Sequence, residues 1–182
     1  MPNYPVHTIA SAPEGSKPAL EQLKKAFGVL PNLPAVIANS PKLINSLVGL
    51  FGQVHSPGLS EAENQIVLLT DAVTNSSTYA VAFHTALALQ QGISPDETTA
   101  IRERRLPADK RFAALSTLAK ALIEKRGHMN EQELNSFTAA GFTKEQVLEV
   151  IAIVAASTIT NYAGTIVNPP LEDPFREYVW SA

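Results

Sequence analysis

Apolar residues recur at three- and four-residue spacing along most of the chain, which is the period of one face of an α-helix. Glycine, proline and small polar residues punctuate this pattern at intervals of about one helix. No stretch alternates apolar and polar residues in the way that half-buried strands do. The pattern therefore predicts an all-α fold, with helices over about 17–27, 31–38, 41–54, 61–75, 76–91, 95–105, 108–126, 131–140 and 144–168.

Small polar residues mark where several of these helices begin. Ser60 followed by Glu63 has the spacing of a capping box, in which the two side chains satisfy each other's free backbone N–H groups. Asn130 and Thr143 are placed as N-caps of two later helices, and Ser16 is expected to cap the first.

The chain is expected to form one domain over 1–182, with an irregular arm (1–18), two helical units (19–92 and 93–168) and a tail (169–182). A weak internal echo suggests that the two units are alike and pack face to face. Leu59-Ser60 recurs in character as Phe142-Thr143, and Tyr79-Ala80 recurs as Tyr162-Ala163. His84 has no counterpart in the second unit, so any chemistry is predicted in the first.

Composition narrows the possible functions. Of 182 residues, 45% are apolar and the formal net charge is −3, which argues against a nucleic-acid partner. The chain has no cysteine, so it can form no disulfide and no thiolate nucleophile. The start of the chain lacks the pattern of a signal peptide, and the apolar run 147–156 is too short to span a bilayer. We expect a cytoplasmic protein that does not engage a membrane.

One motif begins at Leu59-Ser60, continues through Gln65 and the run 75–80 (Asn-Ser-Ser-Thr-Tyr-Ala), and ends at His84. It resembles, without a gap, the motif of the carboxymuconolactone decarboxylase and alkylhydroperoxidase D-like superfamily. The surroundings, from Val29-Leu30-Pro31 to the Pro169-Pro170 tail, are similar to the longer, peroxidase-related members. The resemblance implies an all-helical fold that assembles into dimers, trimers or hexamers.

The departures from the family motif concern the reactive groups. Ser77 and Ala80 stand where the family carries its two cysteines, and Gln65 stands where it carries a glutamate. The resemblance implies that active members pass a proton between that glutamate, a histidine and a thiol pair. Without cysteine, thiol peroxidase activity by this mechanism is excluded. No cofactor and no metal are expected.

Four residues form the candidate site: His84, Tyr79, Gln65 and Ser77. An imidazole can bind a ligand or act as a general base near neutral pH. Three functions remain open: a protein that binds a small molecule or acts on one by acid–base chemistry, a catalytically inert oligomeric module, and a lactone decarboxylase or isomerase. A cavity beside His84 would favour the first or the third.

Each candidate also has a purely structural interpretation. His84 can be a hydrogen-bonded core residue, Tyr79 can bond a backbone carbonyl, and Ser77 can serve the helix start. Ser77 and His84 lie about 10 Å apart along a helix, too far for direct proton transfer. His7, His55 and His128 show no metal-ligand spacing, and Tyr178 and Trp180 are expected to anchor the tail on the body or on a partner chain.

Overall fold

The structure is a computed structural model that describes residues 4–181, in which every regular element is a helix. This confirms the predicted all-α class. The elements in chain order are η1 (Glu14–Ser16), α1 (Lys17–Phe27), α2 (Asn32–Ile37), α3 (Pro41–Val54), α4 (Glu61–Thr74), α5 (Thr78–Gln90), α6 (Pro95–Arg102), α7 (Lys110–Glu124), α8 (Glu131–Ala139), α9 (Lys144–Val167) and η2 (Asp173–Tyr178).

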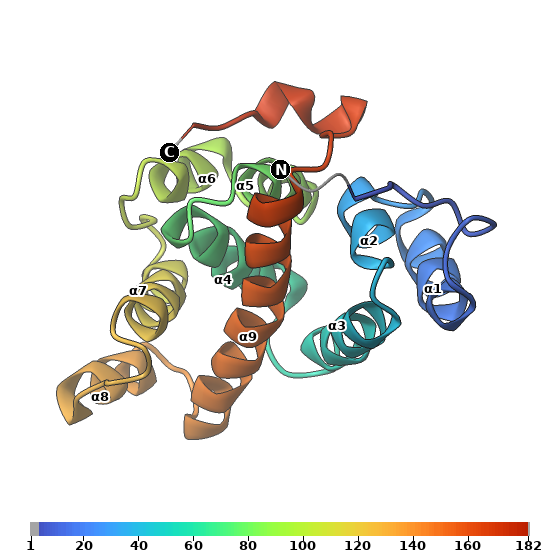
Figure 1. Ribbon diagram of the computed structural model, residues 1–182. Coiled ribbons are helices and arrows are strands. Elements are labelled where there is room, and N and C mark those ends of the chain that lie inside the picture. Colours follow the sequence, from blue (N-terminus) through green and yellow to red (C-terminus); the bar gives the residue numbers. More distant parts are fainter. Residues whose placement is uncertain (1–3, 182) are drawn as a thin grey trace.

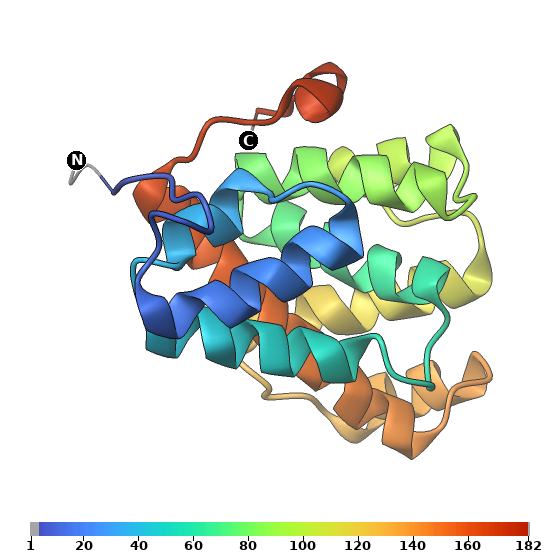
Figure 2. The same cartoon turned by 90° about the vertical axis from the view of Figure 1, so that its right-hand side faces the viewer.

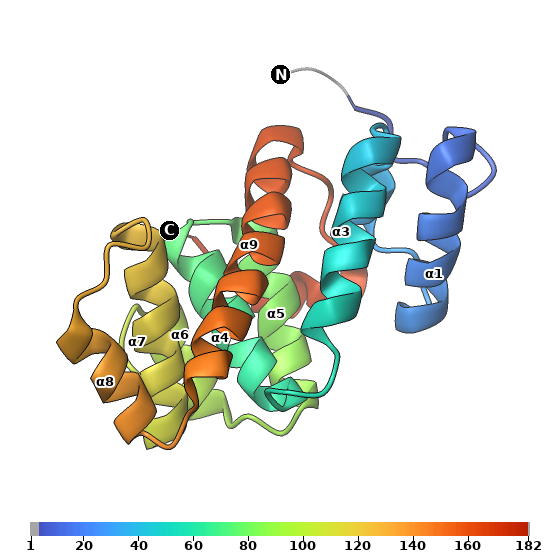
Figure 3. The same ribbon diagram turned by 90° about the horizontal axis from the view of Figure 1, so that it is seen from below.

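The long helix α9 runs through the middle of the molecule, with α1, α2 and α3 on one side and α7 and α8 on the other (Figures 1 and 3). Helices α4 and α5 form an antiparallel pair that packs against it. Ten consecutive residues of α4, from 64 to 73, are buried. Because α4 is buried on all sides, the polar side chains that it carries must find partners inside the protein.

The helix starts follow the capping residues that the sequence predicts. Ser60, Asn130 and Thr143 each form a complete capping box. Ser16 is the exception, because its hydroxyl donates to the carbonyl of Ala38 at 2.7 Å instead of capping α1. The predicted cap at Ser16 is therefore wrong, and its side chain joins the arm to α2.

Some helix boundaries differ from the prediction. The helix predicted over 95–105 ends at Arg102. The helix predicted over 76–91 begins at Thr78, because Ser76 adopts a left-handed conformation with φ 55°. This turn breaks α4 from α5, whereas α9 is continuous through the equivalent part of the second half. The similarity between the two halves is thus visible in the capping boxes at Ser60 and Thr143 and is lost at the turn around Ser76. The division into two helical units stays a prediction.

Helix α9 spans 24 residues, considerably more than the apolar run 147–156. By length and composition alone it is apolar enough to cross a membrane, a test that core helices of soluble proteins also pass. Here it packs against six other helices, α2, α3, α4, α5, α7 and α8. Its apolar composition is accounted for in part by these contacts, and the cytoplasmic location stays a prediction.

The tail after α9 crosses over α5 and α6 (Figures 1 and 2). Trp180 Nε1 donates to the carbonyl of Arg102 at 2.9 Å. The Arg102 guanidinium in turn donates to the carbonyls of Tyr178 and Val179. The Trp180 side chain and the backbone of Tyr178 therefore anchor the tail on the chain's own body, one of the two expected roles.

Candidate functional site

Gln65 and His84 meet where α4 and α5 run side by side. His84 Nδ1 and Gln65 Oε1 lie 3.0 Å apart, and the two residues are separated by 19 positions in the chain. Because an amide oxygen is only an acceptor, the bond requires a proton on His84 Nδ1. The structure thus brings together the two residues that the family motif pairs, with an amide in place of a carboxylate.

The His84 ring is held in its neutral form. The ring is 6% exposed. Burial, with a smaller contribution from the charge that His55 can carry, lowers the pKa of His84 to about 3. Burial has this effect because it disfavours the charged form of a base. With the proton on Nδ1, the lone pair of a neutral His84 is on Nε2.

Two nitrogens of this pair remain available. Within residues 4–181, Nε2 of His84 and Nε2 of Gln65 make no protein hydrogen bond, and neither is among the fully enclosed atoms that lack a partner. As whole residues, His84 is 6% exposed and Gln65 is 4% exposed. The pair offers an acceptor and a donor to a small group that reaches it.

Tyr79 has a different partner from the predicted backbone carbonyl. Its hydroxyl donates to the carboxylate of Glu172 in the tail, at 2.9 and 3.1 Å, and accepts from the N–H of Leu33 at 3.4 Å. Burial and the neighbouring negative charge of Glu172 raise the pKa of Tyr79. The Tyr79 hydroxyl therefore has a structural role: its hydrogen bonds connect α5 to the tail and to α2.

Ser77 lies at the N-cap of α5 but makes no capping bond. Its hydroxyl is buried and has no hydrogen-bond partner within the described chain. Ser77 Oγ packs close to Gly164 of α9, where an added Cβ would sit 3.7 Å from it. The predicted helix-start bond is therefore absent, and nothing activates this hydroxyl as a nucleophile.

His55 and Glu61 lie close to the pair and were not predicted. His55 Nδ1 lies 2.9 Å from a carboxylate oxygen of Glu61, and the ring stacks on Phe51 with centroids 6.0 Å apart. The two residues flank the loop between α3 and α4. Their short separation in the chain is the only feature of the sequence that could have predicted the contact. A carboxylate–imidazole pair therefore exists near the motif, but it uses His55 rather than His84.

Asp71 is the second residue that the sequence analysis missed. Its carboxyl group is fully buried and accepts hydrogen bonds from the amide groups of Asn75 at 2.6 Å and Asn161 at 3.1 Å. Burial raises the pKa of Asp71 to about 7. Asn161 comes from α9, 90 positions away in the chain, so no local spacing could reveal the contact.

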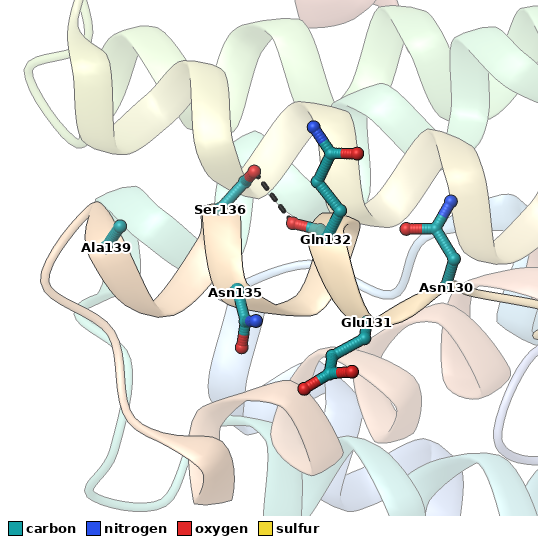
Figure 4. A pocket seen from close by; sticks show the side chains of 6 residues that line it. All are labelled: Asn130, Glu131, Gln132, Asn135, Ser136 and Ala139. Atoms are coloured by element: carbon teal, nitrogen blue, oxygen red, sulfur yellow. Dashed lines mark hydrogen bonds between the residues drawn. The ribbon is translucent and has the colours of Figure 1, made fainter.

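Two surface hollows of the protein contain none of the predicted site residues. The first, of about 750 Å³, is lined by exposed residues of α8 and its N-cap, among them Gln132 and Ser136 (Figure 4). One helix face cannot enclose a ligand. The second, of about 320 Å³, lies between the α3–α4 loop and α9. Across residues 4–181, no three His, Asp or Glu side chains gather as metal ligands.

The fold and the motif geometry define the class as an all-helical, alkylhydroperoxidase D-like protein whose motif site holds an amide, an imidazole and a hydroxyl. The model of the carboxymuconolactone decarboxylase family matches residues 41–124, from the start of α3 to the end of α7. The predicted relationship to the carboxymuconolactone decarboxylase and alkylhydroperoxidase D-like superfamily is therefore confirmed. No curated protein matches the chain in sequence.

Solved structures share the fold over nearly the whole chain. An alkylhydroperoxidase AhpD core, described as an uncharacterized peroxidase-related protein from Ralstonia eutropha JMP134, superposes with a TM-score of 0.84 at 19% identity, covering 95% of this chain and 93% of that one. A peroxidase-related protein from Silicibacter sp. TM1040 gives 0.79 at 15% identity, covering 96% and 92%. The debrominase Bmp8, as a cysteine-to-alanine variant in complex with 2,3,4-tribromopyrrole, gives 0.81 at 15% identity, covering 98% and 96%.

Proposed function

We propose that this chain is a non-redox member of its superfamily that binds a small uncharged molecule at the Gln65–His84 pair. The observation that carries the proposal is the 3.0 Å bond between two neutral side chains where the family motif has a carboxylate and an imidazole. The ligand class is a molecule with an N–H or O–H group, because His84 Nε2 offers a lone pair and Gln65 Nε2 offers a proton.

Aromatic neighbours favour a flat, apolar ligand body. Phe83 lies edge-on to the His84 ring at 5.4 Å and contacts Phe175 of the tail at 5.0 Å. Rings in such clusters favour edge-to-face and offset contacts with another ring. The bromopyrrole held by the cysteine-to-alanine variant of Bmp8 has this character, an apolar ring with one N–H group. We take it as the probe class for this chain.

Acid–base catalysis on a lactone is the weaker candidate. A general base works best when its pKa lies near the working pH, whereas the pKa of His84 is about 3. A ring with so low a pKa accepts a hydrogen bond but seldom takes the proton at pH 7. The same neutral ring that suits binding therefore opposes the decarboxylase or isomerase function.

Assembly into a homo-oligomer is part of the proposal. Large apolar side chains of α9 remain exposed along the helix, among them Leu148, Tyr162 and Ile166, each more than half exposed. Apolar residues gathered on one surface favour a protein partner. We propose that α9 contributes to the contact between copies, which light scattering on the purified chain tests.

The binding proposal is tested by titrating the chain with 2,3,4-tribromopyrrole and with its N-methyl derivative. The parent compound is expected to bind, and the N-methyl compound is expected to bind roughly tenfold more weakly because it cannot donate to His84. His84→Ala should weaken binding of the parent by a similar factor. Ser77→Ala, which removes a hydroxyl without a partner, should leave binding unchanged.

A parallel assay with peroxide and a thiol reductant is expected to show no turnover by the native chain or by His84→Ala. Sustained turnover would contradict the non-redox assignment. If neither pyrrole binds the native chain, the inert oligomeric module is the better description.

A further inference from the structure

The hollow between the α3–α4 loop and the first half of α9 has the composition of a binding site. Its volume is about 320 Å³, at the lower end of the range for small-molecule pockets. The lining is mostly apolar, with a few oxygen-bearing side chains. The lining residues that matter for its chemistry are Val54, Leu59, Asn64, Leu148, Glu149 and Ile153.

Two residues that line this hollow, Asn64 and Glu149, each carry a buried oxygen atom without a partner. Asn64 is 1% exposed, and its amide nitrogen donates to the carbonyl of Val54 at 3.2 Å. That bond fixes the amide, and Oδ1 is left buried with no hydrogen bond within residues 4–181. Oε2 of Glu149 is likewise buried and makes no hydrogen bond within residues 4–181. An unpaired buried acceptor is costly, so two that line one hollow indicate an external donor.

Gly58 brings the loop close to the carboxylate. A Cβ atom added at Gly58 would lie 2.8 Å from both carboxylate oxygens of Glu149. Because real Cβ atoms do not approach so closely, a side chain at this position would displace the Glu149 carboxylate. Glycine therefore allows the loop and α9 to close around the hollow.

We propose that this hollow binds a small primary amine in its ammonium form. Three N–H donors on one nitrogen can serve Glu149 and Asn64 together, and the positive charge complements the half-buried Glu149 carboxylate. The apolar walls formed by Val54, Leu59 and Ile153 then cover a short alkyl chain. The site shares no lining residue with the Gln65–His84 pair, so it is independent of the ligand proposed there.

The test is a ¹H–¹⁵N NMR titration of the full chain with n-butylammonium chloride, at constant ionic strength. Matched titrations use 1-butanol and sodium butyrate, which have the same alkyl chain without the ammonium group. We expect saturable shifts for the ammonium salt in the 53–59 loop and the first half of α9. Glu149→Gln should weaken binding roughly tenfold or more, since a charge-assisted bond is lost.

Two further variants separate a built site from general surface charge. Glu145→Gln removes another carboxylate, which also lines the hollow but belongs to an exposed residue, and should change the affinity less than threefold. Gly58→Ala should weaken binding by displacing Glu149, with little change in melting temperature because a flexible side chain can give way. Equal losses for Glu149→Gln and Glu145→Gln, or no preference for the ammonium salt over butanol, would overturn the proposal. So would the absence of any binding.

Discussion

His84 on α5 and Asp71 on α4 are both buried, and burial shifts their pKa values in opposite directions. The pKa of His84 falls to about 3, and that of Asp71 rises to about 7. Both shifts follow from one cause, because a low-dielectric interior disfavours the charged form of a base and of an acid alike. His84, which the family motif highlights, therefore keeps one charge state at physiological pH. Asp71, outside the motif, titrates there.

The partners of the two groups fit this difference. His84 has a single neutral partner, Gln65, which supplies no charge to stabilise an imidazolium. Asp71 receives N–H groups from Asn75 and Asn161, which partly stabilise its carboxylate against burial. A carboxylate at position 65 would favour a charged histidine, so the glutamine decides the electrostatic character of the motif site.

The largest effect is expected from His84→Gln on the pH dependence of stability. The folded pKa of about 3 lies below the unfolded value of 6.5, so the stability present above pH 6.5 is lost as the pH falls toward 3. The loss attributable to His84 is up to about 5 kcal/mol across this window. His84→Gln should remove it, as measured by denaturant unfolding at pH 4, 5 and 6.5. The control is His128→Gln, at an exposed position. If His84→Gln and His128→Gln have the same dependence of stability on pH, the pKa of His84 is not lowered and its contrast with Asp71 fails.

Asp71 should contribute a pH dependence of stability with the opposite sign, and Asp71→Asn should remove it. The folded pKa of about 7 lies above the unfolded value of 3.8, so stability falls as the pH rises between these values. The difference is up to about 4 kcal/mol. The variant should therefore gain stability relative to the native chain at pH 8 and not at pH 4. Asp96→Asn, at an exposed position, provides the control, and an unchanged slope in Asp71→Asn would show that Asp71 is charged throughout.

Tyr79→Phe tests whether the flank of the motif site is fixed by the tail. Loss of the bond to the Glu172 carboxylate should cost roughly 1.5–3 kcal/mol of unfolding free energy, as is usual for hydrogen bonds to charged groups. Glu172→Gln keeps an acceptor and should cost less. Denaturant unfolding of both variants measures this difference. Equal costs would mean that the charge of Glu172 contributes nothing to the contact.

The smallest effect is expected at the turn between α4 and α5. Ser76 adopts φ 55°, a conformation that costs a non-glycine residue about 1 kcal/mol or more. Ser76→Gly should raise the free energy of unfolding by up to about 1 kcal/mol. The loss of the hydrogen bond from Arg104 to the Ser76 hydroxyl reduces this gain. Ser76→Ala loses the same bond and keeps the strain. If the two variants have equal melting temperatures, the turn is not strained.

The sequence predicts those parts of the fold that local spacing controls. The Ser60–Glu63 capping box and the helical period place α4. Of the four candidate residues, Gln65 and His84 lie in contact in the structure. The contacts of Tyr79 with Glu172 and of Asp71 with Asn161 could not be predicted, because the partners lie 93 and 90 positions away. Contacts of this kind depend on how helices pack in three dimensions, which the helical period alone does not specify.

The charge state of His84 is the most direct test of the account. Long-range ¹H–¹⁵N NMR correlations of the imidazole report both the protonated nitrogen and the titration midpoint. We predict a neutral ring with its proton on Nδ1 from pH 8 down to at least pH 5, unchanged in Asp71→Asn. A midpoint between pH 6 and 7, or a neutral ring with its proton on Nε2, would contradict the neutral Gln65–His84 pair on which the proposed function rests.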